Sequence, residues 1–295
     1  MTNYWELTKT FPNAKNQEVI GEYLLSLKLA NRTERTILAY RWNLERFFRD
    51  KEKAYYALSS EEILESLQKN EAHVKESTYL KALHVLSAFY KFCVYESLME
   101  RSPIKRRWFP RVPKSVPKYL GKDDIAKLRQ VSEKFSNRNQ ALVEFMLTSG
   151  CRVGEVHQLN CEDVDLENRI AQVSGKGNKI RYVHFTEKCA ILLHRYLNQG
   201  RPSTSSSALF VNFKGKRLGI GMMYKIIREI GEKAGISTRM HPHRLRHTFA
   251  TELLAKGAEL SFIGEELGHS DIGTTQIYAR LPKSEIVAQY RKYMG

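Results

Sequence analysis

Apolar and polar side chains in the first hundred residues alternate with the period of an α-helix, and Gly and Pro are rare there. One stretch after Thr33 places large apolar residues on one helical face and arginines on the other; the apolar set is Ile37, Tyr40, Leu44, Phe47 and Phe48. Thr33 can cap this helix, because its side-chain oxygen accepts a hydrogen bond from a free backbone N–H of the first turn. The pattern predicts an amphipathic helix that begins just after Thr33.

Three more segments of this region have helical periodicity. One covers about residues 17–29, and another begins at Ser59-Ser60-Glu61-Glu62, where either glutamate can complete a cap. The longest covers about residues 77–98 and carries an apolar stripe of Leu80, Leu83, Leu86, Tyr90 and Val94. We interpret the aromatic residues as core packing. The region therefore predicts a small helical bundle.

The pattern breaks at residue 101, and a different one follows. Repeated prolines between residues 101 and 120 exclude a continuous helix, and basic residues occur there without an acidic one. A cap-like Gly121 then opens a helix through Leu128, and a more apolar helix covers about 139–148. Residues 169–173 and 180–185 alternate as strands around a turn at 174–178, which predicts a β-hairpin with Lys176 at its tip.

Everything after about Gly221 returns to helical patterning, and the glycine before His269 is expected to end a helix. We expect a mainly α protein of two domains: a helical domain at 1–100, a linker at 101–120, and a mostly helical domain with a small antiparallel sheet at 121–295. A chain of 295 residues is long for one core and sufficient for two.

The chain carries a net charge of +16, which favours a polyanionic partner. Clustered Lys and Arg displace counterions from a phosphate backbone, so nucleic acid is the favoured partner, although ribosomal, heparin-binding and membrane-surface proteins share this property. The linker allows two interpretations. It is either a solvated tether or a basic strap that crosses the DNA backbone, in which case the DNA-binding residues are Arg101, Lys105, Arg106, Arg107, Arg111 and Lys114.

The cysteines and the apolar runs indicate a compartment. The four cysteines are scattered without a C-x-x-C pair, as expected of buried apolar residues in a reducing cytosol. No basic start precedes a long apolar run, and no stretch approaches the length of a membrane span. We expect a soluble cytoplasmic protein associated with the nucleoid.

Three segments far apart in the sequence contain candidate catalytic residues: Gly150-Cys-Arg-Val-Gly-Glu155, His241-Pro-His-Arg-Leu-Arg-His247, and Leu267-Gly-His-Ser-Asp-Ile-Gly-Thr-Thr-Gln-Ile-Tyr278. Attack on a phosphodiester adds negative charge to the non-bridging oxygens, and a guanidinium matches a phosphate with a planar fork of donors. Arg152 and Arg246 suit that role. Glu155 follows Arg152 by three residues, and we expect the two to share a helical face. His243 lies on the same helical face as Arg246 and suits proton transfer, whereas the Arg-rich spacing is poor for a metal site.

In this order the three segments resemble the tyrosine recombinases, and most closely the short two-domain members of the Xer and phage-integrase type. The resemblance implies a core-binding helical domain of the SAM-like type, followed by a catalytic domain that needs neither cofactor nor metal. It identifies Arg152 and Arg246 as the active-site arginines, His243 as an acid-base residue and Glu155 as a supporting carboxylate. It further implies that Lys176 protonates the leaving 5′ oxygen, His269 contacts the phosphate and Tyr278 is the nucleophile.

The resemblance also implies a function and its partners. Tyr278 would form a 3′-phosphotyrosyl link with a specific recombination site in double-stranded DNA. A homotetramer would then exchange strands in pairs through a Holliday junction, with an accessory recombinase or regulatory protein as a further possible partner. The amphipathic tail from Ser284 is either a helix folded on its own domain or one docked on a neighbouring protomer.

Two alternatives use the same residues differently. A type IB topoisomerase shares the phosphotyrosine chemistry but swivels and reseals one duplex. A helix-turn-helix regulator would use the two helices that residues 259–278 suggest, but it leaves Arg152 and Lys176 unexplained.

Overall fold

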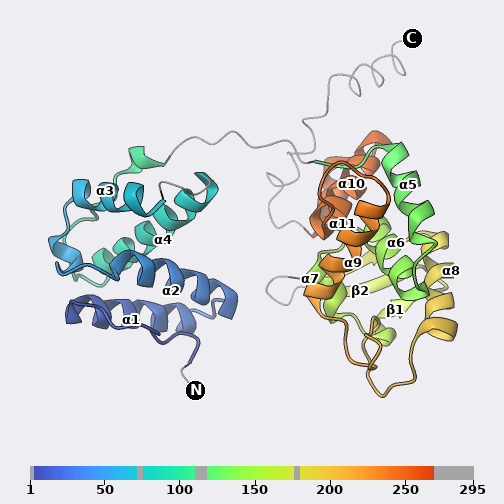
Figure 1. The fold of residues 1–295 in the computed structure, drawn as a ribbon, viewed down its shortest axis with the longest axis horizontal. Helices are drawn as coiled ribbons and strands as arrows, with labels where there is room; N and C mark the ends of the chain where they lie inside the picture. Colours follow the sequence, from blue (N-terminus) through green and yellow to red (C-terminus); the bar gives the residue numbers. More distant parts are fainter. Residues whose placement is uncertain (1–2, 72–75, 110–117, 176–179, 269–295) are drawn as a thin grey trace, which may run out of the picture. The chain divides into compact units, whose positions relative to one another are not determined.

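The computed structural model describes residues 3–71, 76–109, 118–175 and 180–268, and the chain divides into two compact units, Met1–Pro113 and Lys114–Gly295 (Figure 1). The division falls inside the segment expected to be the linker. Each unit has its own hydrophobic core. No helix among the described residues is long and apolar enough to cross a membrane.

The first unit is a bundle of helices, as the periodicity predicts. Its elements are α1 (Ala14–Leu29), α2 (Glu34–Phe48), the short 3-10 turn η1 (Tyr55–Ala57), α3 (Ser60–Glu71), α4 (Glu76–Tyr95) and the 3-10 turn η2 (Arg106–Trp108). Phe89 of α4 lies at the centre of the core, where its ring contacts four other aromatic rings, those of Tyr23, Phe48, Tyr55 and Tyr90. Phe47, Phe48 and Tyr90 are buried in this core and Tyr40 packs against it, which confirms the interpretation of these four residues as core packing.

Both helix starts that cap residues predicted in the first unit are present. The Thr33 side chain accepts a hydrogen bond from the Thr36 backbone N–H at 3.3 Å and caps α2. Ser59 and Glu62 bond reciprocally, each side chain accepting from the other residue's backbone N–H, at 3.1 and 2.9 Å. This is a capping box, and it identifies Glu62 rather than Glu61 as its carboxylate.

The second unit is mostly helical with a small sheet, as expected. Its elements are α5 (Lys122–Ser132), α6 (Asn137–Ser149), α7 (Val153–Gln158), η3 (Cys161–Asp163), β1 (Val164–Asp165), β2 (Ile170–Ser174), β3 (Ile180–His184), α8 (Glu187–Arg195), the π-helical turn η4 (Tyr196–Gly200), α9 (Ile220–Lys233), α10 (Pro242–Ala255) and α11 (Leu260–Leu267). Helix α6 is buried along almost its whole length and packs against α5, α8 and α10. It is the central helix of this core.

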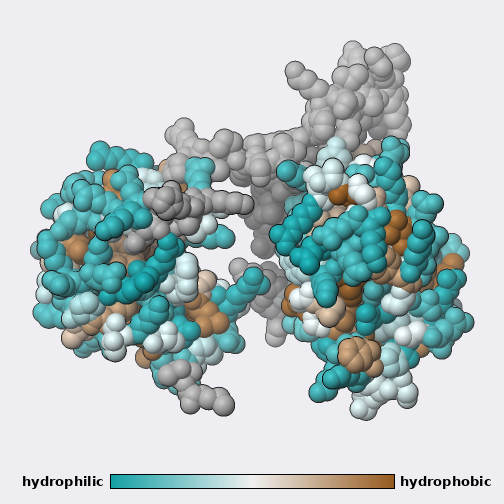
Figure 2. Space-filling view, viewed as in Figure 1, coloured by the Kyte–Doolittle hydropathy of each residue, from teal (hydrophilic) through white to brown (hydrophobic). Residues whose placement is uncertain are grey.

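The sheet is antiparallel in the order β1-β2-β3, with Ala171 of β2 opposite Val183 of β3. The predicted hairpin is therefore present, although the expected tip at Lys176 lies outside the described residues. Strand β1 was not predicted, because two residues are too few to show alternation. Figure 2 shows hydrophilic residues over most of the face that it presents, as expected for two separately packed cores.

Part of the expected linker is fastened to the first unit. Ile104, Trp108 and Phe109 pack against the core of that unit, and the Ser60 hydroxyl donates to the Pro103 carbonyl at 2.7 Å. At the other end, Leu120 is buried in the second core and its backbone N–H donates to the Thr248 hydroxyl at 2.9 Å. Among the described residues, the expected linker therefore includes segments that belong to the two cores.

We expect Phe89→Ala to lower the free energy of unfolding of the first unit by about 3–5 kcal/mol, because a fully buried ring leaves a cavity. Tyr95→Ala, on the same helix but 86% exposed, is the control and should change it by less than about 0.5 kcal/mol. All three tryptophans, Trp5, Trp42 and Trp108, lie in the first unit, so tryptophan fluorescence during urea unfolding reports on it selectively. Equal effects of the two substitutions would contradict this description of the core.

Candidate active site

The two candidate arginines meet near the ends of three helices. Helix α6 ends at Gly150, whose φ of 62° is left-handed, and a Cβ there would overlap the Phe249 ring of α10. Only glycine fits this turn without strain. The chain then runs extended through Arg152, which is the N-cap of α7. The glycine turn thus places Arg152 beside α10.

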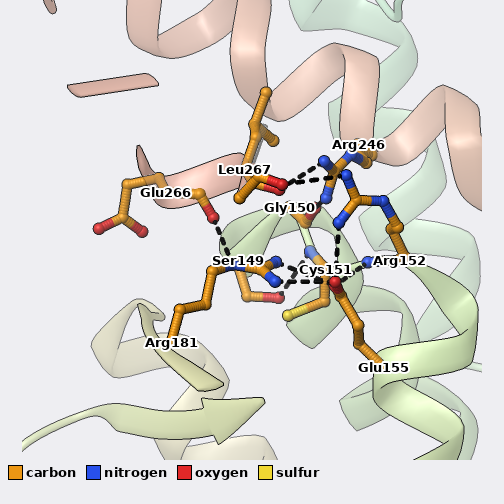
Figure 3. Close-up of polar contacts among 10 residues, drawn as sticks. Ser149, Gly150, Cys151, Arg152, Glu155, Arg181, Arg246, Glu266 and Leu267 are labelled. Carbon is orange, nitrogen blue, oxygen red and sulfur yellow. Dashed lines mark hydrogen bonds and ion pairs between the residues drawn. The ribbon is translucent and has the colours of Figure 1, made fainter. Parts of the chain in front are cut away.

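Arg246 extends from α10, a helix that begins with proline at its first position. Its guanidinium is buried and donates to the Gly150 carbonyl at 2.7 Å and to the Leu267 carbonyl at 2.6 Å (Figure 3). Both carbonyls lie at helix ends, where backbone acceptors lack partners within their own helix. Arg246 therefore joins the ends of α6 and α11.

Arg152 approaches the same helix end and is more accessible. One of its terminal nitrogens donates to Glu155 at 2.9 Å and the other to the Gly268 carbonyl at 3.3 Å. Its side chain is 35% exposed. Arg152 and Arg246 thus bind the carbonyls of two consecutive residues, Gly268 and Leu267. These bonds to Glu155 and Gly268 use two of the five guanidinium N–H groups of Arg152, so further N–H groups are able to bind an anion.

Glu155 supports Arg152 differently from the expectation that the two share a helical face. Arg152 precedes α7, Glu155 is the third residue of that helix, and the Arg152 backbone N–H donates to the Glu155 carboxylate at 2.7 Å. The pair forms a cap as well as an ion pair. The expected supporting contact is present, but the expected helical face is wrong because α7 begins one residue later.

The other partner of Glu155, Arg181 of β3, was not predicted. Its terminal nitrogens donate to both oxygens of Glu155, at 2.7 and 2.9 Å. Burial alone raises the pKa of the Glu155 carboxyl, but the hydrogen bonds and charge of Arg181, together with hydrogen bonds from Arg152, hold it below its ordinary value. The carboxylate is therefore ionised at neutral pH. One sequence signal was available, since Arg181 shares a strand face with buried Val183 and a charge there needs a partner.

The histidines of α10 lie in a positive environment. His243 is exposed to solvent on one side, and the packing of neighbouring atoms around its ring, followed by the charges of Arg246 and Arg152, lowers its pKa. The ring of His241 lies 6.5 Å from that of His243, and its pKa is lowered for similar reasons. His243 is therefore neutral at pH 7 and able to accept a proton, in keeping with the acid-base role expected for it.

Helix α11 ends at Gly268, which has a left-handed φ of 62°. The predicted glycine stop is confirmed. His269 and Tyr278 follow it but lie outside the described residues, as does Lys176. Within the described ranges, no group of three His, Cys, Asp or Glu side chains could hold a metal ion.

The candidate DNA-binding residues of the linker are only partly described. Arg101, Arg106 and Arg107 are exposed, whereas Lys105 forms an ion pair with Glu61 at 3.0 Å. Arg111 and Lys114 lie outside the described residues. The four described candidates, Arg101, Lys105, Arg106 and Arg107, all belong to the first unit.

Comparisons with known proteins show the family to which the chain belongs. Residues 118–285 match the family model described as Phage integrase family. The chain is 34% identical over 225 residues to the tyrosine recombinase XerC of Lactobacillus delbrueckii subsp. bulgaricus, covering 74% of this chain and 76% of that protein. It is 32% identical over 288 residues to the tyrosine recombinase XerD of Staphylococcus epidermidis, covering 93% and 98%.

Solved structures of recombinases have a similar fold. A crystal structure of XerA recombinase aligns with a TM-score of 0.57 at 28% identity, covering 94% of this chain and 98% of that one. The XerH recombinase bound to a palindromic difH substrate aligns with a TM-score of 0.76, covering 99% and 92%. At 21% identity, this second likeness shows the fold alone.

We expect acid to destabilise the second unit, because His247 of α10 is neutral in the folded protein. Burial, followed by the charges of His243, Arg246 and His241, lowers the pKa of His247 from 6.5 to about 4. Between these values the unfolded chain binds more protons than the folded chain, so stability present above pH 6.5 is lost as the pH falls toward 4. We expect His247→Gln to flatten the loss between about pH 7 and pH 5.

Urea unfolding followed by circular dichroism, with tryptophan fluorescence to separate the first unit, measures this effect. The chosen range lies above the ordinary value of 4.5 for Glu155, whose pKa is lowered, so that carboxylate stays ionised throughout. An unchanged pH dependence in the variant would show that His247 takes up its proton equally in both states.

Proposed function

Because this chain belongs to the phage integrase family and is a tyrosine-type site-specific recombinase that cleaves and rejoins DNA, we propose that Arg152 and Arg246 hold the scissile phosphate while Tyr278 attacks it. One observation carries the proposal. The two guanidinium groups come from positions far apart in the sequence and bind consecutive carbonyls at the end of α11. The segment that follows this helix end contains His269 and Tyr278.

The proposed reaction conserves the phosphoester bond. The Tyr278 oxygen bonds to phosphorus, the bond from phosphorus to the 5′ oxygen breaks, and a 3′-phosphotyrosyl link remains. A 5′ hydroxyl of the partner strand then attacks this link and releases the tyrosine. One ester replaces another, so the exchange needs no external energy source.

The side chains divide the charge and proton transfers. Forming phenolate at pH 7 costs about 4 kcal/mol for a free tyrosine, so the reaction needs a nearby base and positive charge. Neutral His243 accepts the phenol proton, and Lys176 gives a proton to the leaving 5′ oxygen. His269 and the two arginines stabilise the charge that builds on the phosphate.

The proposed partner is double-stranded DNA carrying a specific recombination site. Relatives of the same fold are described as bound to such DNA, among them XerH with difH and a lambda integrase dimer on a COC′ core site. We propose that four copies of this chain assemble on two sites and exchange strands in pairs through a Holliday junction. The enzyme then works on the nucleoid, in the cytoplasm, with the basic strap against the DNA backbone.

We expect Tyr278→Phe to bind recombination-site DNA with an unchanged dissociation constant and to form no covalent adduct, because only the attacking oxygen is removed. A suicide substrate nicked near the cleavage point traps the adduct, which denaturing electrophoresis detects. Sequencing the released end identifies the attacked bond and its polarity. An adduct formed by the variant would reject Tyr278 as the nucleophile. Efficient relaxation by the wild type of supercoiled DNA that lacks the site would indicate that the enzyme swivels one duplex, as a type IB topoisomerase does.

The strap should contribute through charge alone. The logarithm of the binding constant falls linearly with the logarithm of the salt concentration, and each phosphate that the protein no longer neutralises makes this fall less steep by about 0.9. We therefore expect the double substitution Arg106→Gln and Arg107→Gln to make it less steep by about 1–2 and to weaken specific and non-specific DNA binding alike. Fluorescence anisotropy titrations at several salt concentrations measure this. A wild-type slope in the double variant would show that the segment is a solvated tether.

A further inference from the structure

Arg181 enters the active site from the sheet and is oriented inward. Its side chain is 15% exposed, less than half the value for Arg152. Besides its two bonds to Glu155, its Nε donates to the Glu266 carbonyl at 3.2 Å (Figure 3). The three bonds connect β3 with α7 and with the last turn of α11. A guanidinium held by three bonds to protein is poorly placed to bind a phosphate itself.

The same guanidinium also supports the end of α11. A Cβ placed at Gly268 would lie 2.9 Å from three atoms of Arg181, so the Gly268 backbone lies directly against the guanidinium. The Gly268 carbonyl is in turn an acceptor for Arg152. Arg181 therefore touches both groups that Arg152 binds, the Glu155 carboxylate and the Gly268 residue.

The contact that both arginines make with Glu155 determines how many N–H groups of Arg152 are left to bind a substrate. A buried carboxylate demands bonds from cations, and an arginine offers it two parallel N–H groups when no other cation is present. Arg181 supplies that two-point contact, so Arg152 gives Glu155 only one side-chain nitrogen. Without Arg181, the Arg152 fork would turn toward the carboxylate and away from the DNA.

We infer that Arg181 is a positioning residue for DNA cleavage, which neutralises Glu155 and supports Gly268 so that Arg152 keeps its outward N–H groups for the scissile phosphate. The inference rests on the proposed function, because it takes Arg152 as a phosphate-binding residue. It distinguishes Arg181, whose Nε and two terminal nitrogens all donate to protein acceptors, from Arg152, which the proposed function assigns to the DNA.

The test measures the first-order rate of adduct formation on a suicide substrate at saturating DNA, because this rate does not depend on the folded fraction. We expect Arg181→Gln to slow the rate about 10²-fold while the dissociation constant for DNA changes less than about threefold. Arg181→Lys keeps the charge but lacks the planar fork, so its rate should fall between those of the wild type and Arg181→Gln.

Arg129 provides the matched control. It makes a two-point contact with Glu144 in the same unit, at 3.0 and 2.7 Å, and its side chain is 34% exposed. Arg129→Gln breaks a comparable buried ion pair that joins α5 to α6. We expect it to leave the adduct rate within about threefold of the wild type. An equal slowing by both substitutions would reduce the Arg181 effect to general destabilisation and overturn the inference.

A double-mutant cycle with Glu155→Gln tests the stated cause. If Arg181 acts by neutralising the carboxylate, removing both groups should slow the reaction no more than Arg181→Gln alone. Losses that multiply would overturn the inference, as would a near-wild-type rate for Arg181→Gln. The proposed function fails separately, if the wild type forms no adduct or if Arg152→Gln forms it at the wild-type rate.

Discussion

The second unit depends on one buried carboxylate held between two guanidinium groups. Glu155 is almost fully buried, and an isolated charge there would cost several kcal/mol. Arg181 and Arg152 remove that cost from opposite directions, one from the sheet and one from the cap of α7. Because each arginine also reaches α11, the ion pairs fix the positions of three elements at once. The described part of the site, around Arg152 and Arg246, is therefore held in place by contacts within the protein.

Backbone carbonyls provide the second constraint. The last carbonyls of a helix carry partial negative charge and have no N–H partner within it. Arg246 uses the ends of α6 and α11 in this way, and Arg152 binds the residue next to one of those carbonyls. These acceptors offset the repulsion between neighbouring cations in the free protein. In the proposed function, guanidinium groups that are already oriented need little rearrangement to bind the scissile phosphate, and they stabilise the transition state, in which the phosphate carries the most negative charge.

The first unit is stabilised mainly by aromatic packing rather than by ion pairs. Its core is a cluster of aromatic rings centred on Phe89, and its helix starts are set by local caps at Thr33 and Ser59. Ile104, Trp108 and Phe109 pack against this core, so the described basic segment 101–109 is anchored to the first unit at these residues. Exposed arginines on an anchored segment lose less conformational entropy on binding than arginines on a flexible tether.

Much of this organisation was predictable from the sequence because it depends on local pattern. Helical periodicity predicted the bundle, the alternation at 169–173 and 180–185 predicted the hairpin, and glycine predicted the end of α11. The segments around Arg152, Arg246 and Tyr278 predicted the family, which the comparisons confirm. The roles of the individual residues stay predictions.

Local patterns in the sequence were enough to predict most of the helices and the hairpin, and the order of three short motifs was enough to predict the family and its candidate side chains. Which of these candidates meet depends on the tertiary structure. The bond from Arg152 to Gly268 spans 116 positions and the bond from Arg246 to Gly150 spans 96, so both follow from helix packing rather than spacing. Arg181 was missed for the same reason. A lone arginine in a strand shows its role only when the carboxylate it neutralises has been brought beside it.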